Sequence, residues 1–190
     1  MDGAIDNKMN KTRKKISPVV LLILGLIICL VLIFRYGFEL GTWKGKSLDG
    51  YRDKAYNSGS FTLSELPAGA QDFRWQCYNY GMAAYSYAGF TLTGQEYDDY
   101  TLYASNTVNS TKEDKENFVG KKVSDTIAYY DDYGNYTGFP KKNCKYVIDD
   151  NIEDYTILYY VSYNGAGSHV NAVVVKPDTG RFVVICGGSN

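Results

Sequence analysis

The sequence predicts an α+β protein in which an N-terminal transmembrane helix precedes one extracellular domain, where a helix packs on an antiparallel sheet. Three observations predict this class. Residues Ile16–Phe34 form a long apolar run, residues Gln71–Ala88 suit a helix, and the chain after residue 154 alternates strand-like runs with turns.

The apolar run Ile16–Phe34 contains 19 residues and no charged side chain. At about 1.5 Å per residue a helix of this length reaches roughly 28 Å, close to the hydrocarbon thickness of a bilayer. Residues 1–15 hold five basic and two acidic side chains, and basic flanks tend to stay in the cytoplasm. We therefore predict a cytoplasmic basic tail over 1–15, a single-pass signal-anchor over 16–36 and an extracellular C-terminal domain at the cell membrane.

Two other interpretations of the apolar run fit less well. A cleaved secretory signal has an apolar region of about 7–15 residues that ends in small residues, and the following FRYGFELG offers no such cleavage site. A lipoprotein signal would use Cys29, but bulky Ile28 precedes that cysteine and further apolar residues follow it. The run therefore favours a retained anchor.

The rest of the chain divides into a spacer and a domain. Residues 37–63 are rich in Gly, Ser, Lys and Tyr without clear periodicity, which predicts a spacer, and residues 64–190 are long enough for one domain with a core. Residues 37–190 hold 14 basic and 19 acidic side chains, and this net charge of −5 argues against nucleic acid as a partner. The chain has 19 tyrosines, which suit both β-rich surfaces and contact faces.

The first predicted element of the domain is a helix over Gln71–Ala88. Asp72 is suited to cap its start, the alanines near its end favour helix, and Gly89 stands where a glycine often ends one. The polar and charged residues 105–125 predict a loop or a short exposed helix.

The last third predicts a β-meander. Its β-branched and aromatic runs are separated by residues typical of turns, of which Pro177-Asp-Thr-Gly180 is the strongest. The predicted strands are Tyr155–Tyr163, Val170–Lys176 and Arg181–Cys186.

Three cysteines follow the apolar run: Cys77, Cys144 and Cys186. Because three is odd, at most one intramolecular disulfide forms and one thiol is left over. A bond between Cys144 and Cys186 would leave Cys77 free. The alternative is that all three are reduced, buried, small apolar residues.

Cys77 and the one histidine of the chain, His169, are the candidate catalytic pair. A thiol nucleophile needs a base within hydrogen-bond reach. A cysteine early on a helix and a histidine that opens a facing strand would provide this arrangement.

Two segments resemble transglutaminase-like domains, a group of papain-like cysteine hydrolases. Cys77-Tyr-Asn-Tyr80-Gly-Met-Ala-Ala is similar to the cysteine helix of that family, and the segment from His169 to Cys186 resembles its histidine hairpin. The resemblance implies that Cys77 attacks an amide or peptide carbonyl to form a thioester, with His169 as base and then acid. It implies cell-surface protein or peptidoglycan peptide as substrate.

This sequence departs from the family at two positions. Asn171 stands where the family has Trp, and the family's third catalytic residue, Asp, would fall on Ile185 or Cys186. Asp178 and Asn190 are open as replacements, whereas Asn171 lies on the same strand face as His169 and is too close in sequence to reach the far nitrogen of its ring. Gln71, at the papain-like offset of six residues before the cysteine, and Gln76 are both open as oxyanion donors.

The alternative function is a non-catalytic, Tyr-rich surface module for binding or assembly. Adjacent carboxylates on a strand point to opposite faces, so they are poor candidates for the carboxylate pair of a glycosidase. We therefore predict solvated turns at the doublets Asp98-Asp99, Asp131-Asp132 and Asp149-Asp150. No cofactor is implied, and the chain has no C-x-x-C signature for a metal.

Overall fold

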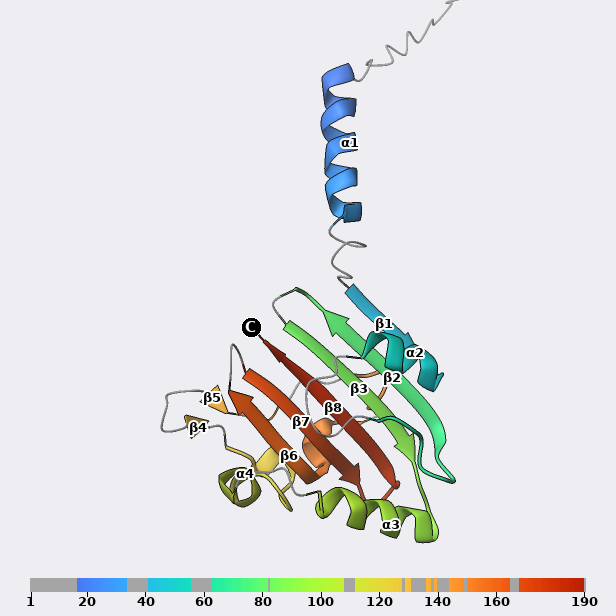
Figure 1. Ribbon diagram of the computed structural model, residues 1–190, viewed down its shortest axis with the longest axis vertical. Helices are drawn as coiled ribbons and strands as arrows, with labels where there is room; N and C mark the ends of the chain where they lie inside the picture. The colour runs from blue at the N-terminus through green and yellow to red at the C-terminus, as the bar shows by residue number, and fades with distance from the viewer. Residues whose placement is uncertain are drawn as a thin grey trace, which may run out of the picture. The chain divides into compact units, whose positions relative to one another are not determined.

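The computed structural model describes residues 17–33, 41–55, 63–81, 83–107, 112–127, 129–130, 136–137, 139, 144–148, 150–164 and 168–189. The chain divides into two units, Met1–Glu39 and Leu40–Asn190. Within the first unit the described residues form the helix α1 (Pro18–Leu32), and within the second they form an α+β domain, as predicted. Figure 1 shows the elements of both units.

Helix α1 begins with Pro18 at its first turn, where the missing N–H of proline costs no hydrogen bond. It is apolar on all sides, and none of its residues is buried. The prediction of a transmembrane signal-anchor over 16–36 is wrong. Helix α1 has 15 residues, about 22 Å of length, and among the described residues no helix is long and apolar enough to cross a membrane.

The predicted single-pass arrangement depended on that span and is corrected with it. The membrane as a partner and the position at the cell membrane stay predictions. Residues 1–15 lie outside the described residues, so the position of the basic tail stays a prediction. The extracellular position of the domain likewise stays a prediction.

The domain is built on one antiparallel sheet of six strands, in the order β1-β2-β3-β8-β7-β6 (Figure 1). A separate two-stranded ribbon pairs β4 with β5. The strands are β1 (Gly41–Gly45), β2 (Gln71–Asn79), β3 (Ala83–Thr91), β4 (Tyr129–Tyr130), β5 (Tyr136–Thr137), β6 (Thr156–Asn164), β7 (Ser168–Lys176) and β8 (Arg181–Ser189). The helices of the domain are α2 (Leu48–Lys54), α3 (Gly94–Ser105) and α4 (Lys112–Asn117), with 3-10 turns at Val123–Asp125 and Ile152–Asp154.

The predicted meander is confirmed. β6, β7 and β8 pair consecutively, and the turn between β7 and β8 covers residues 177–180. Gly180 has a φ of +64°, and a Cβ there would meet the carbonyl oxygen of Leu92 at 2.1 Å. Only glycine fits this corner, which explains the strength of the turn signal.

The predicted helix over Gln71–Ala88 is wrong, because these residues form the hairpin β2–β3. Along β2 every second side chain is buried, from Phe73 through Trp75 to Cys77, which is the period of a strand. Gly89 lies inside β3, where a Cβ would come within 2.8 Å of the Arg181 guanidinium. Gly89 therefore does not end a helix. Its missing side chain leaves room for the Arg181 guanidinium against the sheet.

Part of the predicted spacer belongs to the domain. Residues 41–45 form edge strand β1, which pairs with β2 from Gly41 opposite Asn79 to Gly45 opposite Trp75. Helix α2 follows, with the Ser47 hydroxyl accepting the Gly50 N–H at 3.3 Å, and buries Tyr51. A Cβ at Gly45 or Gly50 would come within 3 Å of the Trp75 ring, so both glycines let the chain cross this indole closely.

The sheet is buried on both faces. One face packs against Tyr51 of α2 and against Tyr100 and Ala104 of α3, together with Leu63. The other face packs against described residues that follow α4 in the chain, among them Phe118, Val123, Cys144 and Val147. The predicted loop or exposed helix at 105–125 is thus partly buried, since Phe118 and Val123 are in this core.

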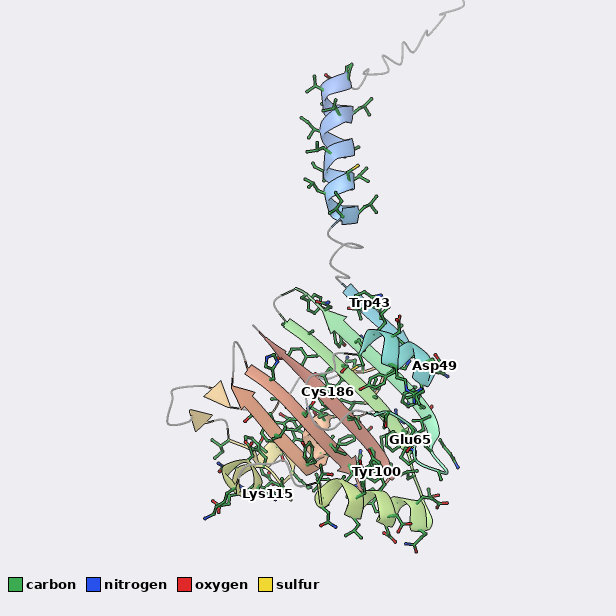
Figure 2. The ribbon with its side chains drawn as sticks, in the orientation of Figure 1. Trp43, Asp49, Glu65, Tyr100, Lys115 and Cys186 are labelled. Carbon is green, nitrogen blue, oxygen red and sulfur yellow. The ribbon has the colours of Figure 1, made fainter. Side chains whose placement is uncertain are left out.

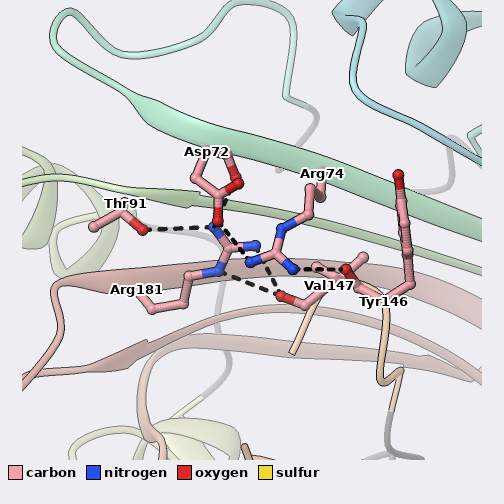
Figure 3. A network of polar contacts seen from close by, with 6 residues as sticks. All are labelled: Asp72, Arg74, Thr91, Tyr146, Val147 and Arg181. Atoms are coloured by element: carbon pink, nitrogen blue, oxygen red, sulfur yellow. Dashed lines mark hydrogen bonds and ion pairs between the residues drawn. The ribbon is translucent and has the colours of Figure 1, made fainter. Parts of the chain in front are cut away.

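A buried arginine holds the second cover in place. The Arg181 guanidinium, 3% exposed, donates to the Val147 carbonyl at 2.8 Å and to the Asp72 carbonyl at 2.8 Å (Figure 3). Arg74 donates to the Tyr146 carbonyl at 3.3 Å and to the Asp72 carboxylate at 2.6 Å. Asp72 has a φ of +48° at a register shift in β2, a conformation that Asp tolerates better than most residues.

We expect Arg181→Leu to lower the free energy of unfolding by about 2–4 kcal/mol, because it leaves the buried Val147 carbonyl and the part-buried Asp72 carbonyl without this donor. Urea denaturation of the full chain measures the change. The control is Arg52→Leu, which removes an exposed pair with Asp49 and should cost about 1 kcal/mol or less. Equal losses in the two variants would contradict the role given to Arg181.

Candidate functional site

The predicted nucleophile, Cys77, lies in a strand and not on a helix. Its side chain is 2% exposed and belongs to the core under α2 and α3. It stands opposite Ser86 of β3, which stands opposite Cys186 of β8, which stands opposite Asn171 of β7. A row of small polar side chains therefore crosses the middle of the sheet, where Figure 2 labels Cys186.

The thiols in this row are held in their neutral form. Burial, with smaller contributions from Cys144 and Cys186, raises the pKa of Cys77 from 9.0 to about 12. Burial also raises the pKa of Cys186 to about 12, although hydrogen bonds with Ser86 and Tyr51 act in the opposite direction. Since the thiolate is the nucleophile, neither group is activated near neutral pH.

His169 lies on β7, half-buried, opposite Gly188 of β8. Strands β3 and β8 separate it from Cys77, so the two backbones are roughly 14 Å apart across the sheet at about 4.8 Å per strand. A nucleophile and its base need contact at about 3 Å. The structure therefore does not bring Cys77 and His169 together.

The cysteine nearest to His169 in the register is Cys186. Because His169 pairs with Gly188 and Asn171 pairs with Cys186, His169 and Cys186 are diagonal neighbours on one face. Cys186 is 3% exposed with its pKa raised by burial, so this proximity does not make it a nucleophile.

The candidates for the remaining catalytic roles are also dispersed. Asn171 is buried within the row, Asp178 lies in the turn beyond the far end of β7, and Asn190 lies outside the described residues. Gln71 begins β2, about 20 Å along the strand from Cys77. Gln76 points to the opposite face, where its side-chain oxygen accepts a hydrogen bond from the Cys144 thiol at 3.3 Å.

All four cysteines are free thiols. Cys77 and Cys186 are separated by β3, roughly 10 Å across the sheet and beyond the reach of a disulfide. Cys144 packs on the other face. Of the two interpretations of the cysteines, the structure agrees with reduced, buried, small apolar residues, and no described group of His, Cys, Asp and Glu is arranged to hold a metal.

The described residues form a cavity elsewhere, between the segment 63–68 and α3, which we call the α3 groove. Its main part has a volume of about 430 Å³ and is lined by Leu63, Ser64, Glu65, Leu66, Pro67, Ala68, Tyr100 and Tyr103. An adjoining part has a volume of about 250 Å³. It is lined by Pro67, Ala68, Tyr100 and Tyr103, which also line the main part, and by Glu96 and Asp99. Figure 2 labels Glu65 and Tyr100 at this end of the domain.

The floor of the α3 groove is packed against the core. The Tyr100 ring packs edge-on against Phe90 and Phe182 at centroid distances of 5.2 and 5.0 Å. Leu63 is buried in the same core. The segment turns at Pro67, whose carbonyl accepts the Ala70 N–H at 3.1 Å, and this turn closes the rim. The cavity is therefore formed by side chains that also pack in the core.

The Tyr100 hydroxyl has an unusual environment. The side chain is 8% exposed and lines both parts of the groove. Among the described residues the hydroxyl has no hydrogen-bond partner, and burial raises its pKa. Because the hydroxyl oxygen is itself buried and interacts electrostatically with Tyr51 and Cys186, it faces the core, and the ring of Tyr100 is what the groove presents.

The sequence analysis missed the groove because it missed α3. Tyrosines at 97, 100 and 103 recur every third residue, which is the signal of one helix face. The doublet Asp98-Asp99, predicted as a solvated turn, is exposed but lies on this helix. The other two doublets lie partly or wholly outside the described residues.

Comparison with known proteins provides no relative: no protein-family model, no curated protein and no solved structure matches this chain. The resemblance to transglutaminase-like domains stays a prediction.

We expect iodoacetamide at pH 8 to modify Cys29, which is exposed, while Cys77, Cys144 and Cys186 react only after denaturation. With a pKa of about 12, roughly one Cys77 thiol in 10⁴ is ionised at that pH. Peptide mapping by mass spectrometry gives the rate at each cysteine. Fast labelling of Cys77 that His169→Ala abolishes would contradict this account and restore the catalytic pair.

Proposed function

We propose that the unit Leu40–Asn190 is a non-catalytic binding module and that the α3 groove is its ligand site. One observation carries the proposal: a preformed cavity of about 430 Å³ combines aromatic, apolar and carboxylate side chains at an accessible surface. Cavities of about 300–1,000 Å³ with this mixed lining are typical ligand sites.

The thiol chemistry supports a binding function over a catalytic one. Cys77 is buried and neutral, and two strands separate it from the strand of His169. The transglutaminase-like hydrolase is the alternative hypothesis. It requires a thiolate and a base in contact within a cleft, and the groove contains neither Cys77 nor His169.

The tyrosine content also fits a binding module. Tyr103 is 62% exposed at the rim of the groove, where its ring lies 5.8 Å from that of buried Tyr100. Such a pair offers a ligand a large apolar surface at a small cost in side-chain entropy, because a Tyr side chain has few rotatable bonds.

The test is a screen of neutral, cationic and anionic fragments against the full ¹⁵N-labelled chain, followed by amide chemical shifts. We expect at least one fragment to shift the signals of Ser64, Ala68 and Tyr103. For that fragment Tyr103→Ala should weaken binding about fivefold or more, since an aromatic contact is worth about 1 kcal/mol.

The matched control is Leu102→Ala on the same helix. Leu102 is as exposed as Tyr103 but does not line the groove, so its removal should leave the affinity unchanged. Two outcomes would overturn the proposal: no fragment shifts the groove signals, or the shifts centre on Cys77 and His169.

A further inference from the structure

The charged side chains that line the α3 groove are all acidic. Three carboxylates line it: Glu65 in the main part, and Glu96 and Asp99 in the adjoining part. Among the described residues of the lining none is Lys, Arg or His. A ligand that carries a positive charge is therefore the one whose charge complements the site.

The apolar part of the groove defines the body of that ligand. Tyr100 and Tyr103 present ring surfaces, and Leu63, Leu66 and Pro67 continue them along the segment. An aliphatic chain packs on such a surface while its charged head reaches a carboxylate or a ring face. Lysine and arginine side chains combine both features.

The ligand would meet the ring of Tyr100 and not its hydroxyl. The hydroxyl oxygen is itself buried, and it interacts electrostatically with the core residues Tyr51 and Cys186. The charge complementarity of the groove therefore comes from its carboxylates.

We infer that the α3 groove binds a lysine or arginine side chain of a peptide or protein partner. The inference rests on the proposed binding function and adds the chemical class of the ligand.

The experiment compares three capped tripeptides that differ only at the central residue: lysine, norleucine or glutamate. Each is titrated into the full ¹⁵N-labelled chain, and amide shifts of the groove give the dissociation constant. We expect the lysine peptide to bind at least about fivefold more tightly than the norleucine peptide at low salt, and the difference to shrink as salt rises.

Variants that each remove one carboxylate test the contribution of charge to binding. Asp99→Asn removes a carboxylate of the lining, and the Asn side chain can still accept the hydrogen bond from Gln95. It should weaken binding of the lysine peptide about threefold or more, and Glu65→Gln should act in the same direction. Asp98→Asn changes the net charge equally, but Asp98 does not line the groove, so it should have little effect.

The outcomes separate the two proposals. Norleucine or glutamate peptides that bind at the groove as tightly as the lysine peptide would overturn the inference and leave the binding function standing. Equal losses in Asp98→Asn and Asp99→Asn would also overturn it. Absence of any groove shift with the peptides and with all fragments would overturn the binding function itself.

Discussion

The buried guanidinium of Arg181 is the interaction on which the rest of the domain depends. It lies at the start of β8 and joins the Asp72 carbonyl of β2 to the Val147 carbonyl of the covering segment. Three parts of the chain that are distant in sequence therefore meet at one side chain (Figure 3). Gly89 is required there because a Cβ would come within 2.8 Å of the guanidinium.

This arrangement explains why the chemistry of the thiols is suppressed. With covers on both faces of the sheet, Cys77 and Cys186 become parts of one core and Cys144 part of the other. Burial then disfavours the thiolate, and the separation of β2 from β7 keeps the one histidine away from Cys77. A hollow of ligand size lies at α3, away from these thiols, and the proposed binding function rests on that contrast.

The sequence predicted those elements whose signals are local. Strands β6, β7 and β8 follow each other directly, and Gly180 marks the turn between the last two, so the meander was predictable. The hairpin β2–β3 was not. Asp72 and Gly89 resemble helix caps, yet one sits at a register shift and the other makes room for Arg181, a partner about 90 residues away.

Residues 41–55 were not predictable either. They lack periodicity, and their structure depends on pairing with β2 and on the Trp75 indole, which no local pattern reveals.

The site was less predictable than the fold. The groove needs α3 and the segment 63–68 at once, and only the tyrosine spacing of α3 was visible in the sequence. Cys77 and His169 were predicted as a pair because their side chains suit cysteine catalysis. Their spacing along the chain does not show that β3 and β8 lie between them in the sheet.

The most direct test of this account is the alkylation rate of Cys144 in Arg181→Leu, measured in the full chain by iodoacetamide and mass spectrometry without denaturant. If the Arg181 guanidinium holds residues 144–148 on the sheet, its removal should raise the rate at Cys144 about tenfold or more. Cys77 and Cys186, on the other face, should stay protected. A rate at Cys144 equal to that of the unchanged chain, or a parallel rise at all three cysteines, would contradict it.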